Sequence, residues 1–262
     1  MATTITIANS KGGVGKTTCC VMFSYLLAQR GFNVLTIDFD PQADCSKMLF
    51  KTYQGTEEEE KPSFYESIQS ERLEEAIVSL TDHHDILPSD RDLLGFERYV
   101  YSQTVDVSKT SFFLDYLLEP LKETYDFIFI DVAPTTSEKT NNAVVASDYA
   151  LIVMQTHQHS YEQSTSFVDY LREMAEYNPE LDLLGVVPYY IKKEGKIDNE
   201  VLEEAKEWFG DLLFTTPIYA RERVKLFSKQ GVKNNDRHDQ QAIRMYDAVL
   251  DEILEKVGEE RG

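Results

Sequence analysis

The stretch Lys11–Thr18, KGGVGKTT, follows the apolar run Thr3–Ala8 and precedes a helix-like segment from Cys19 to Gln29. A glycine-rich loop between a strand and a helix gathers backbone N–H groups around an anion, and the positive end of the helix dipole reinforces them. Lys16 supplies a charge for the β and γ phosphates of a nucleotide, and the Thr17 hydroxyl can ligate Mg²⁺. The sequence therefore predicts a phosphate-binding loop made of Lys11, Gly12, Gly13, Val14, Gly15, Lys16, Thr17 and Thr18.

Two features separate this loop from its nearest alternatives. Ser10 stands where the usual loop has its first glycine, but Lys11 follows it and adds a second lysine, which indicates a distinct subtype. A dinucleotide-binding fingerprint would match Gly13 and Gly15 and the later Asp38 and Asp40, but it requires a third glycine where Thr18 stands. A glycine-rich turn without a ligand does not explain the strand before the loop and the helix after it.

Strand-like apolar runs alternate with amphipathic stretches along the chain. The runs NVLTID, HDILPS, YDFIFID, YALIVMQ and LLGVVPYY have strand length. This alternation predicts an α/β fold with a doubly wound, mostly parallel sheet and helices on both faces. Such sheets bind ligands beyond the carboxyl ends of their strands, where the loop, Asp40 and Asp131 all fall.

Composition favours one domain over residues 1–262. A chain of 262 residues that is 42% hydrophobic can bury a large core. No apolar run approaches the roughly 18 residues of a membrane span, and no signal peptide is evident, so we expect a cytoplasmic location. Cys19, Cys20 and Cys45 do not form a disulfide pattern.

Further segments accompany the loop: IDFDPQAD (37–44), ILPSDRDL (86–93), YDFIFIDVAPT (125–135) and TTPIYARERVKLFSKQGV (215–232). With KGGVGKTT they resemble, in order and over nearly the whole chain, the ParA-type ATPases of the deviant Walker A group of P-loop NTPases. That group also includes MinD and the nitrogenase iron protein. Because no cysteine follows Cys45, the iron–sulfur members of the group are excluded.

The resemblance assigns roles around the loop. Asp131 ends an apolar strand and looks like the Walker B aspartate, so Thr17, Asp38 and Asp131 are the predicted Mg²⁺ residues. Asp40 matches the switch residue that helps to place the attacking water. The residue matching Lys11 reaches the partner's nucleotide in an ATP-bound homodimer. We therefore expect a slow ATPase with Lys11, Lys16, Asp40 and Asp131 as its catalytic residues.

A basic stripe contrasts with the net charge of −20. It comprises Arg221, Arg223, Lys225, Lys229 and Lys233, and its spacing predicts that Arg221, Lys225 and Lys229 share one side of a helix. By itself the stripe is typical of a solvated helix face. The resemblance instead implies non-specific DNA binding by the ATP dimer, through backbone contacts without base readout.

Three weaker expectations remain. Adenine contacts in relatives point to Tyr189 and Pro217. We expect His157 and His159 to be ordinary loop histidines rather than a pair of metal ligands. Residues 241–257 predict an amphipathic helix whose acidic polar face favours core packing over membrane binding.

The resemblance implies DNA partition, and segregation of a plasmid is the form we expect first. It also implies a nucleoid-associated location and a centromere-binding ParB-type adaptor protein as the partner. Two alternatives stay open. One is positioning of another cargo, as in MinD-like or carboxysome-distributing relatives. The other is a P-loop biosynthetic ligase.

Overall fold

The fold is built on one sheet, seen in a computed structural model that describes residues 1–54, 61–156, 158–192 and 195–260. Within these residues the sheet has eight strands in the order β3-β4-β2-β5-β1-β6-β7-β8. The strands are β1 (Thr3–Ala8), β2 (Val34–Asp38), β3 (Val78–Thr81), β4 (His84–Leu87), β5 (Phe127–Asp131), β6 (Tyr149–Gln155), β7 (Asp182–Ile191) and β8 (Ile218–Tyr219). Only β3 among them pairs antiparallel, with β4 at one edge.

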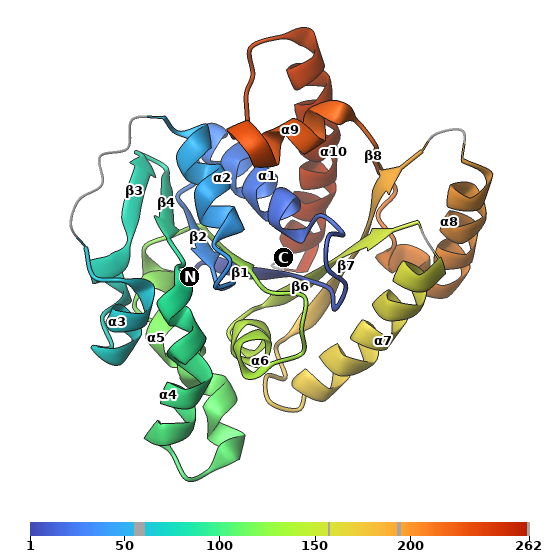
Figure 1. The fold of residues 1–262 in the computed structure, drawn as a ribbon. Helices are drawn as coiled ribbons and strands as arrows, with labels where there is room; N and C mark the ends of the chain where they lie inside the picture. The colour runs from blue at the N-terminus through green and yellow to red at the C-terminus, as the bar shows by residue number, and fades with distance from the viewer. Residues whose placement is uncertain (55–60, 157, 193–194, 261–262) are drawn as a thin grey trace.

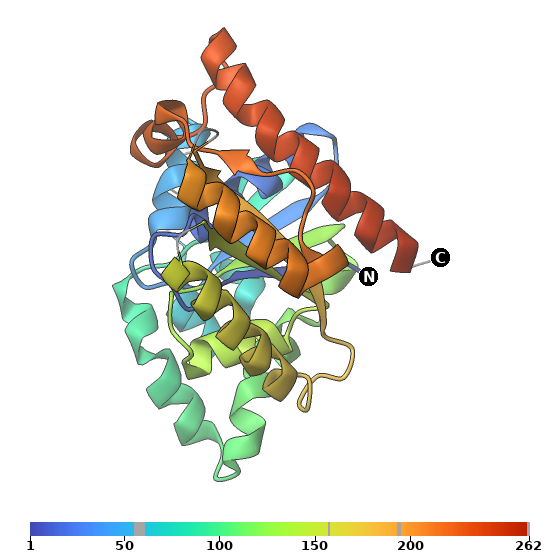
Figure 2. The same cartoon turned by 90° about the vertical axis from the view of Figure 1, so that its right-hand side faces the viewer.

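Helices cover both faces of the sheet (Figures 1 and 2). One face carries α1 (Lys16–Gln29), α2 (Asp44–Thr52), α9 (Glu222–Gln230) and α10 (Arg237–Glu260). The other carries α3 (Phe64–Gln69), α4 (Phe96–Gln103), α5 (Phe113–Leu118), α6 (Glu138–Val145), α7 (Gln158–Met174) and α8 (Lys196–Phe209). The predicted doubly wound α/β fold is confirmed.

The central strands are buried on both faces because their side chains are apolar in nearly every position. In β5, Ile128 and Ile130 join the core beneath α5 and α6, while Phe127 and Phe129 join the core beneath α1. Nearly continuous apolar strands are what a sheet with two covered faces requires.

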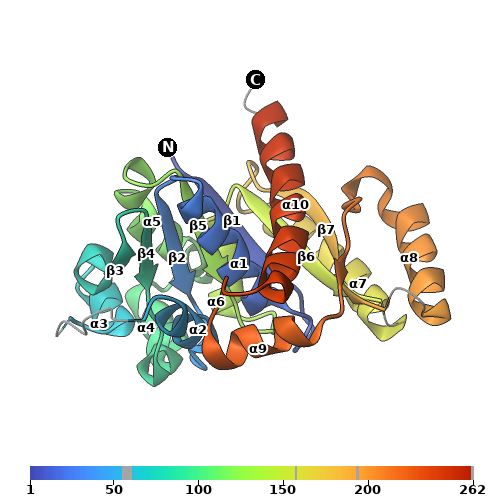
Figure 3. The ribbon, with the colours of Figure 1, turned by 90° about the horizontal axis from the view of Figure 1, so that it is seen from above.

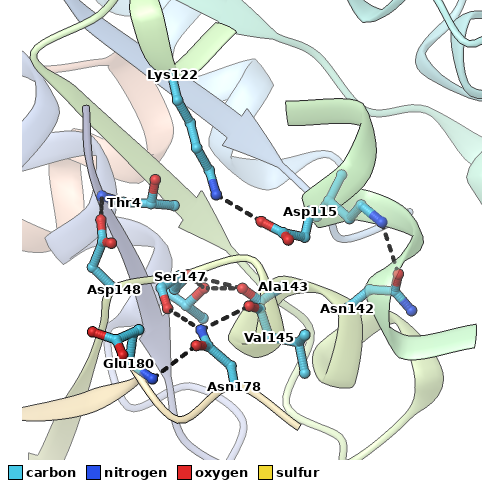
Figure 4. Close-up of polar contacts among 12 residues, drawn as sticks. Thr4, Asp115, Lys122, Asn142, Ala143, Val145, Ser147, Asp148, Asn178 and Glu180 are labelled. Carbon is cyan, nitrogen blue, oxygen red and sulfur yellow. Dashed lines mark hydrogen bonds and ion pairs between the residues drawn. The ribbon is translucent and has the colours of Figure 1, made fainter. Parts of the chain in front are cut away.

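Polar contacts connect the segments at the amino ends of the central strands β1 and β6 (Figure 4). The Asp148 carboxylate accepts the Thr4 N–H at 2.7 Å, and Asn178 Nδ2 donates to the carbonyls of Val145 and Ser147 at 2.9 Å each. These contacts fix the connections at this end of the strands. The loops that carry the predicted nucleotide residues lie at the opposite end.

Several local expectations need correction. Residues 99–109 contain Ser, Thr and Tyr in a pattern that predicts a surface connection, but they begin inside α4, because Phe96 and Val100 are one helical turn apart and both are buried. β3 and β8 were not predicted. Residues 57–60 and His157 lie outside the described residues, and the structure describes no side chain for His159. The C-terminal helix is confirmed and longer than expected, and its Tyr246, Val249 and Ile253 are buried in the core.

Among the described residues, no helix is both long enough and apolar enough to cross a membrane.

Candidate nucleotide site

The glycine-rich loop connects β1 to α1 and is fixed by side chains on both sides. The Asn9 amide donates to the Val153 carbonyl of β6 at 2.8 Å, and Asn9 Oδ1 accepts the Lys11 N–H at 3.1 Å. From the end of β6, Gln155 Nε2 donates to the Gly13 carbonyl at 3.0 Å. The loop is therefore tied to the neighbouring strand at its start and at its centre.

Gly15 ends the loop in a conformation that requires glycine. Its φ is +102°, and an added Cβ would lie 2.3 Å from Cε1 of Tyr189. The Tyr189 ring thus packs directly on the backbone where α1 begins.

The loop opens into a cavity of about 550 Å³ (Figure 3 shows the surrounding α1, α2 and α9). Its walls come from the loop, from the segment after β2, from the ends of β5, β6 and β7, and from one side of α9. The lining residues are Gly13, Gly15, Lys16, Thr17, Thr18, Asp40, Gln42, Asp44, Val132, Pro134, Gln155, Tyr189, Tyr190, Val224, Lys225 and Ser228. The structure therefore brings five of the predicted loop residues together with Asp40 and Tyr189, whereas Lys11, Gly12 and Val14 do not line the cavity.

Lys16 is the buried cation of this cavity, with 6% of its surface exposed. Its ammonium donates to the Lys11 carbonyl at 2.9 Å. Burial lowers the pKa of Lys16 to about 8, while the carboxylates of Asp131 and Asp40 oppose that shift. A buried ammonium beside an open cavity is stabilised further by any anion that enters.

Asp131, at the end of β5, is the carboxylate whose surroundings best suit a metal ligand. Burial, followed by the charge of Asp38, raises its pKa well above the usual value, while a hydrogen bond from the Thr17 side chain opposes the shift. Its Oδ1 is buried, and no described residue donates to it. A buried acceptor without a donor, beside a threonine hydroxyl and a glycine-rich loop, fits Mg²⁺ bound together with a nucleotide.

Asp38 lies beside Asp131 across the paired strands β2 and β5. It is fully buried, and its Oδ2 accepts the Ser46 N–H at 2.8 Å and the Ser46 hydroxyl at 2.6 Å. Burial raises its pKa to about 6 although these hydrogen bonds oppose the shift. Asp38 therefore anchors the first turn of α2, and it does not line the cavity.

Asp40 differs from Asp38, as the alternation along an extended chain predicts. It is half-buried and lines the cavity, and its Oδ1 accepts the Gln42 N–H at 2.9 Å. The two carboxylates thus face different surroundings, one in the protein interior and one toward the nucleotide cavity.

The two predicted adenine residues separate in the structure. The Tyr189 ring borders the cavity, and its hydroxyl lies 3.4 Å from that of Tyr246. Pro217 instead lines a second cavity, of about 470 Å³, between α8 and α10. The position of Pro217 gives no support to an adenine contact.

The basic stripe is only partly available as positive surface. Arg221 precedes α9 in extended conformation, so it does not share a helix face with Lys225 and Lys229. Arg223 pairs with Asp236 and, at 3.0 Å, with Asp239. Lys225 pairs with Glu222 at 2.9 Å, and its ammonium lies 5.8 Å from the ring centre of Tyr190.

Sequence reasoning missed several residues of the cavity. Gln155 reaches the loop only because β6 lies next to β1, and Tyr190 lines the wall in a left-handed backbone conformation, with φ +61°. Neither position carries a sequence motif. For Tyr190, the adjacent Tyr189 at the same strand end was the local signal that could have found it.

A family model described as an AAA domain matches residues 2–183. An uncharacterised protein from Pseudomonas putida is 34% identical over 222 residues, which are 83% of this chain and 81% of that protein. The sporulation initiation inhibitor protein Soj of Bacillus subtilis is 30% identical over 235 residues, or 88% of this chain and 89% of Soj.

Solved structures show the same architecture. An aspartate-to-alanine variant of McdA from Cyanothece, in complex with ATP, superposes with a TM-score of 0.81 and 25% sequence identity. The match covers 98% of this chain and 96% of McdA.

Proposed function

This chain belongs to the ParA and Soj family of P-loop partition ATPases, and we propose that it segregates DNA by an ATP-gated cycle. In this cycle, ATP and Mg²⁺ hold two copies together, the dimer binds DNA non-specifically, and hydrolysis releases it. The observation that carries the proposal is that Lys16 and Thr17 line one cavity while the buried Asp131 carboxylate lies behind them, hydrogen-bonded to Thr17 and close enough to Lys16 for their charges to interact.

The glycine-rich loop would provide most of the contacts that bind ATP before hydrolysis. Backbone N–H groups and the Lys16 ammonium neutralise the phosphates, and Thr17 with Asp131 would hold Mg²⁺, which stabilises charge on the β and γ phosphates. Because phosphoryl transfer depends chiefly on positioning and charge, these groups can support turnover without covalent help from the protein.

Asp40 is the proposed residue for placing the attacking water. It lies on the cavity wall and bends the segment that leads into α2. We propose that intrinsic hydrolysis is slow because a bound adaptor completes this geometry. The adaptor is a DNA-bound protein with a cationic segment, which the acidic surface of this chain would attract.

Lys11 gives the proposal its sharpest test. Its backbone is fixed by Asn9 and by the Lys16 ammonium, so a change of its side chain leaves the loop framework in place. We expect Lys11→Ala to bind ATP as a monomer, whereas wild type dimerises with ATP and Mg²⁺. Light scattering combined with a fluorescent-nucleotide titration measures both properties.

Lys109→Ala is the control for loss of an exposed lysine outside the cavity wall, between α4 and α5. An ATP-dependent dimer of the Lys11→Ala variant would remove Lys11 from the interface. A wild-type protein that stays monomeric with ATP and Mg²⁺ would refute the cycle itself.

The chemistry of the site also serves a second candidate function, the positioning of a protein cargo. Membership of the ParA and Soj family favours it over a biosynthetic ligase. Both roles share the nucleotide and DNA steps, so identification of proteins retained with ATP and DNA separates them by the nature of the adaptor and its cargo.

A further inference from the structure

The ends of α2 and α9 are locked together (Figures 1 and 3). The Thr52 hydroxyl at the end of α2 accepts the Val232 N–H at 2.9 Å. Gly231 ends α9 with φ +77°, and an added Cβ would lie 2.4 Å from the Thr52 nitrogen. Only glycine fits at this contact, so the two helix ends form one surface.

Three lysines surround this contact. Lys51 is exposed at the end of α2, and Lys229 is exposed in the last turn of α9. Lys233 follows α9, and its ammonium donates to the Lys51 carbonyl at 3.3 Å, which brings the two residues side by side. We call Lys51, Lys229 and Lys233 the joint lysines.

The joint lysines differ from the neighbouring cations in their ion pairing. Carboxylates neutralise Arg223 and Lys225 within the fold. Within the described part of the chain, no carboxylate pairs with a joint lysine. Lys233 bonds only a carbonyl there, which leaves its positive charge uncompensated.

Unpaired lysines on a protein of net charge −20 restrict where a polyanion can bind. Flexible ammonium groups without an aromatic platform suit phosphate contacts rather than base readout. We propose that the joint lysines form the DNA-backbone contact of this protein, with Lys51 of α2 as a member and Arg223 as a residue that supports α9 from within. This inference rests on the proposed function.

The same helix connects this surface to the nucleotide site. α2 begins where Asp38 holds Ser46, and it ends at Lys51 and Thr52. The segment that carries Asp40 leads directly into α2. A shift of this segment with the nucleotide therefore moves the joined ends of α2 and α9 together relative to the nucleotide cavity, which gives DNA affinity a route to depend on nucleotide state.

Single charge reversals test the surface. We expect Lys51→Glu and Lys229→Glu each to weaken ATP-dependent retention of duplex DNA by about tenfold or more, since a dimer carries each change twice. Lys51→Arg, which keeps the charge, is expected to retain DNA. Lys196→Glu on α8, where the side chain is 91% exposed, is the matched control and is expected to behave as wild type.

ATP-dependent dimerisation of each variant, followed by light scattering, confirms that the variants fold and bind nucleotide. If the wild-type protein binds DNA and the Lys51→Glu variant binds it equally well, this inference is overturned and the proposed function stands. Absence of DNA binding by the wild-type dimer would instead refute the proposed function. Retention on vesicles of anionic lipid, with the same lysine dependence and no DNA binding, would reassign the surface to a membrane.

Discussion

At the scale of single residues, His84 is a buried histidine that holds three elements together. Its Nε2 lies 2.9 Å from the Thr36 hydroxyl of β2, and its Nδ1 lies 2.8 Å from the Tyr53 hydroxyl after α2. Burial lowers the pKa of His84 to about 3. The folded state therefore keeps His84 neutral at a pH where the unfolded chain protonates it.

The sign of the resulting pH effect is defined. Because the unfolded chain binds the proton with a pKa near 6.5, the stability that His84 contributes is present above that value and is lost as pH falls toward 3. Between pH 7 and 5.5 we expect this loss to reach about 1 kcal/mol in the free energy of unfolding. Urea denaturation at both pH values, for wild type and His84→Gln, measures it.

The raised pKa values of Asp38 and Asp92, both about 6, act in the opposite direction, because protonation in the folded state stabilises it as pH falls. Their effect is common to both proteins and cancels in the comparison. Equal pH dependence in wild type and His84→Gln would show that His84 does not contribute.

At the scale of elements, the joint between α2 and α9 depends on one hydroxyl. Thr52 donates to the Met48 carbonyl at 2.8 Å and accepts the N–H of Val232, a residue that is 4% exposed. Thr52→Val preserves the shape and leaves that buried N–H without its acceptor, which costs about 1–3 kcal/mol. We expect faster hydrogen exchange at Val232 and weaker DNA retention, whereas Thr52→Ser keeps both near wild type. Unchanged exchange in Thr52→Val would show that the hydroxyl does not hold the joint.

Elements also show how far sequence patterns reach. The β1–loop–α1 unit was predictable because its glycines and apolar run are local signals, and Asp131 because it ends a buried strand. The ion pairs of Arg223 were not predictable from the sequence, because Asp236 and Asp239 become its neighbours only through the turn into α10. Lys51 was missed for the same reason: no spacing rule links it to Lys233, 182 positions away.

At the scale of the whole molecule, the net charge of −20 opposes DNA, and the proposed dimer offsets this by doubling the joint lysines. Three lysines per subunit give about six phosphate contacts, so the logarithm of DNA affinity should fall with the logarithm of salt concentration with a slope of about −5. The Lys11→Ala monomer should show a slope nearer −3 and much weaker binding. Fluorescence anisotropy on duplex DNA over a KCl series, with ATP and Mg²⁺, measures both slopes. A slope near zero for wild type, or equal slopes for the two proteins, would be incompatible with a dimer that binds through these lysines, because counterion release counts the phosphates that a bound protein neutralises.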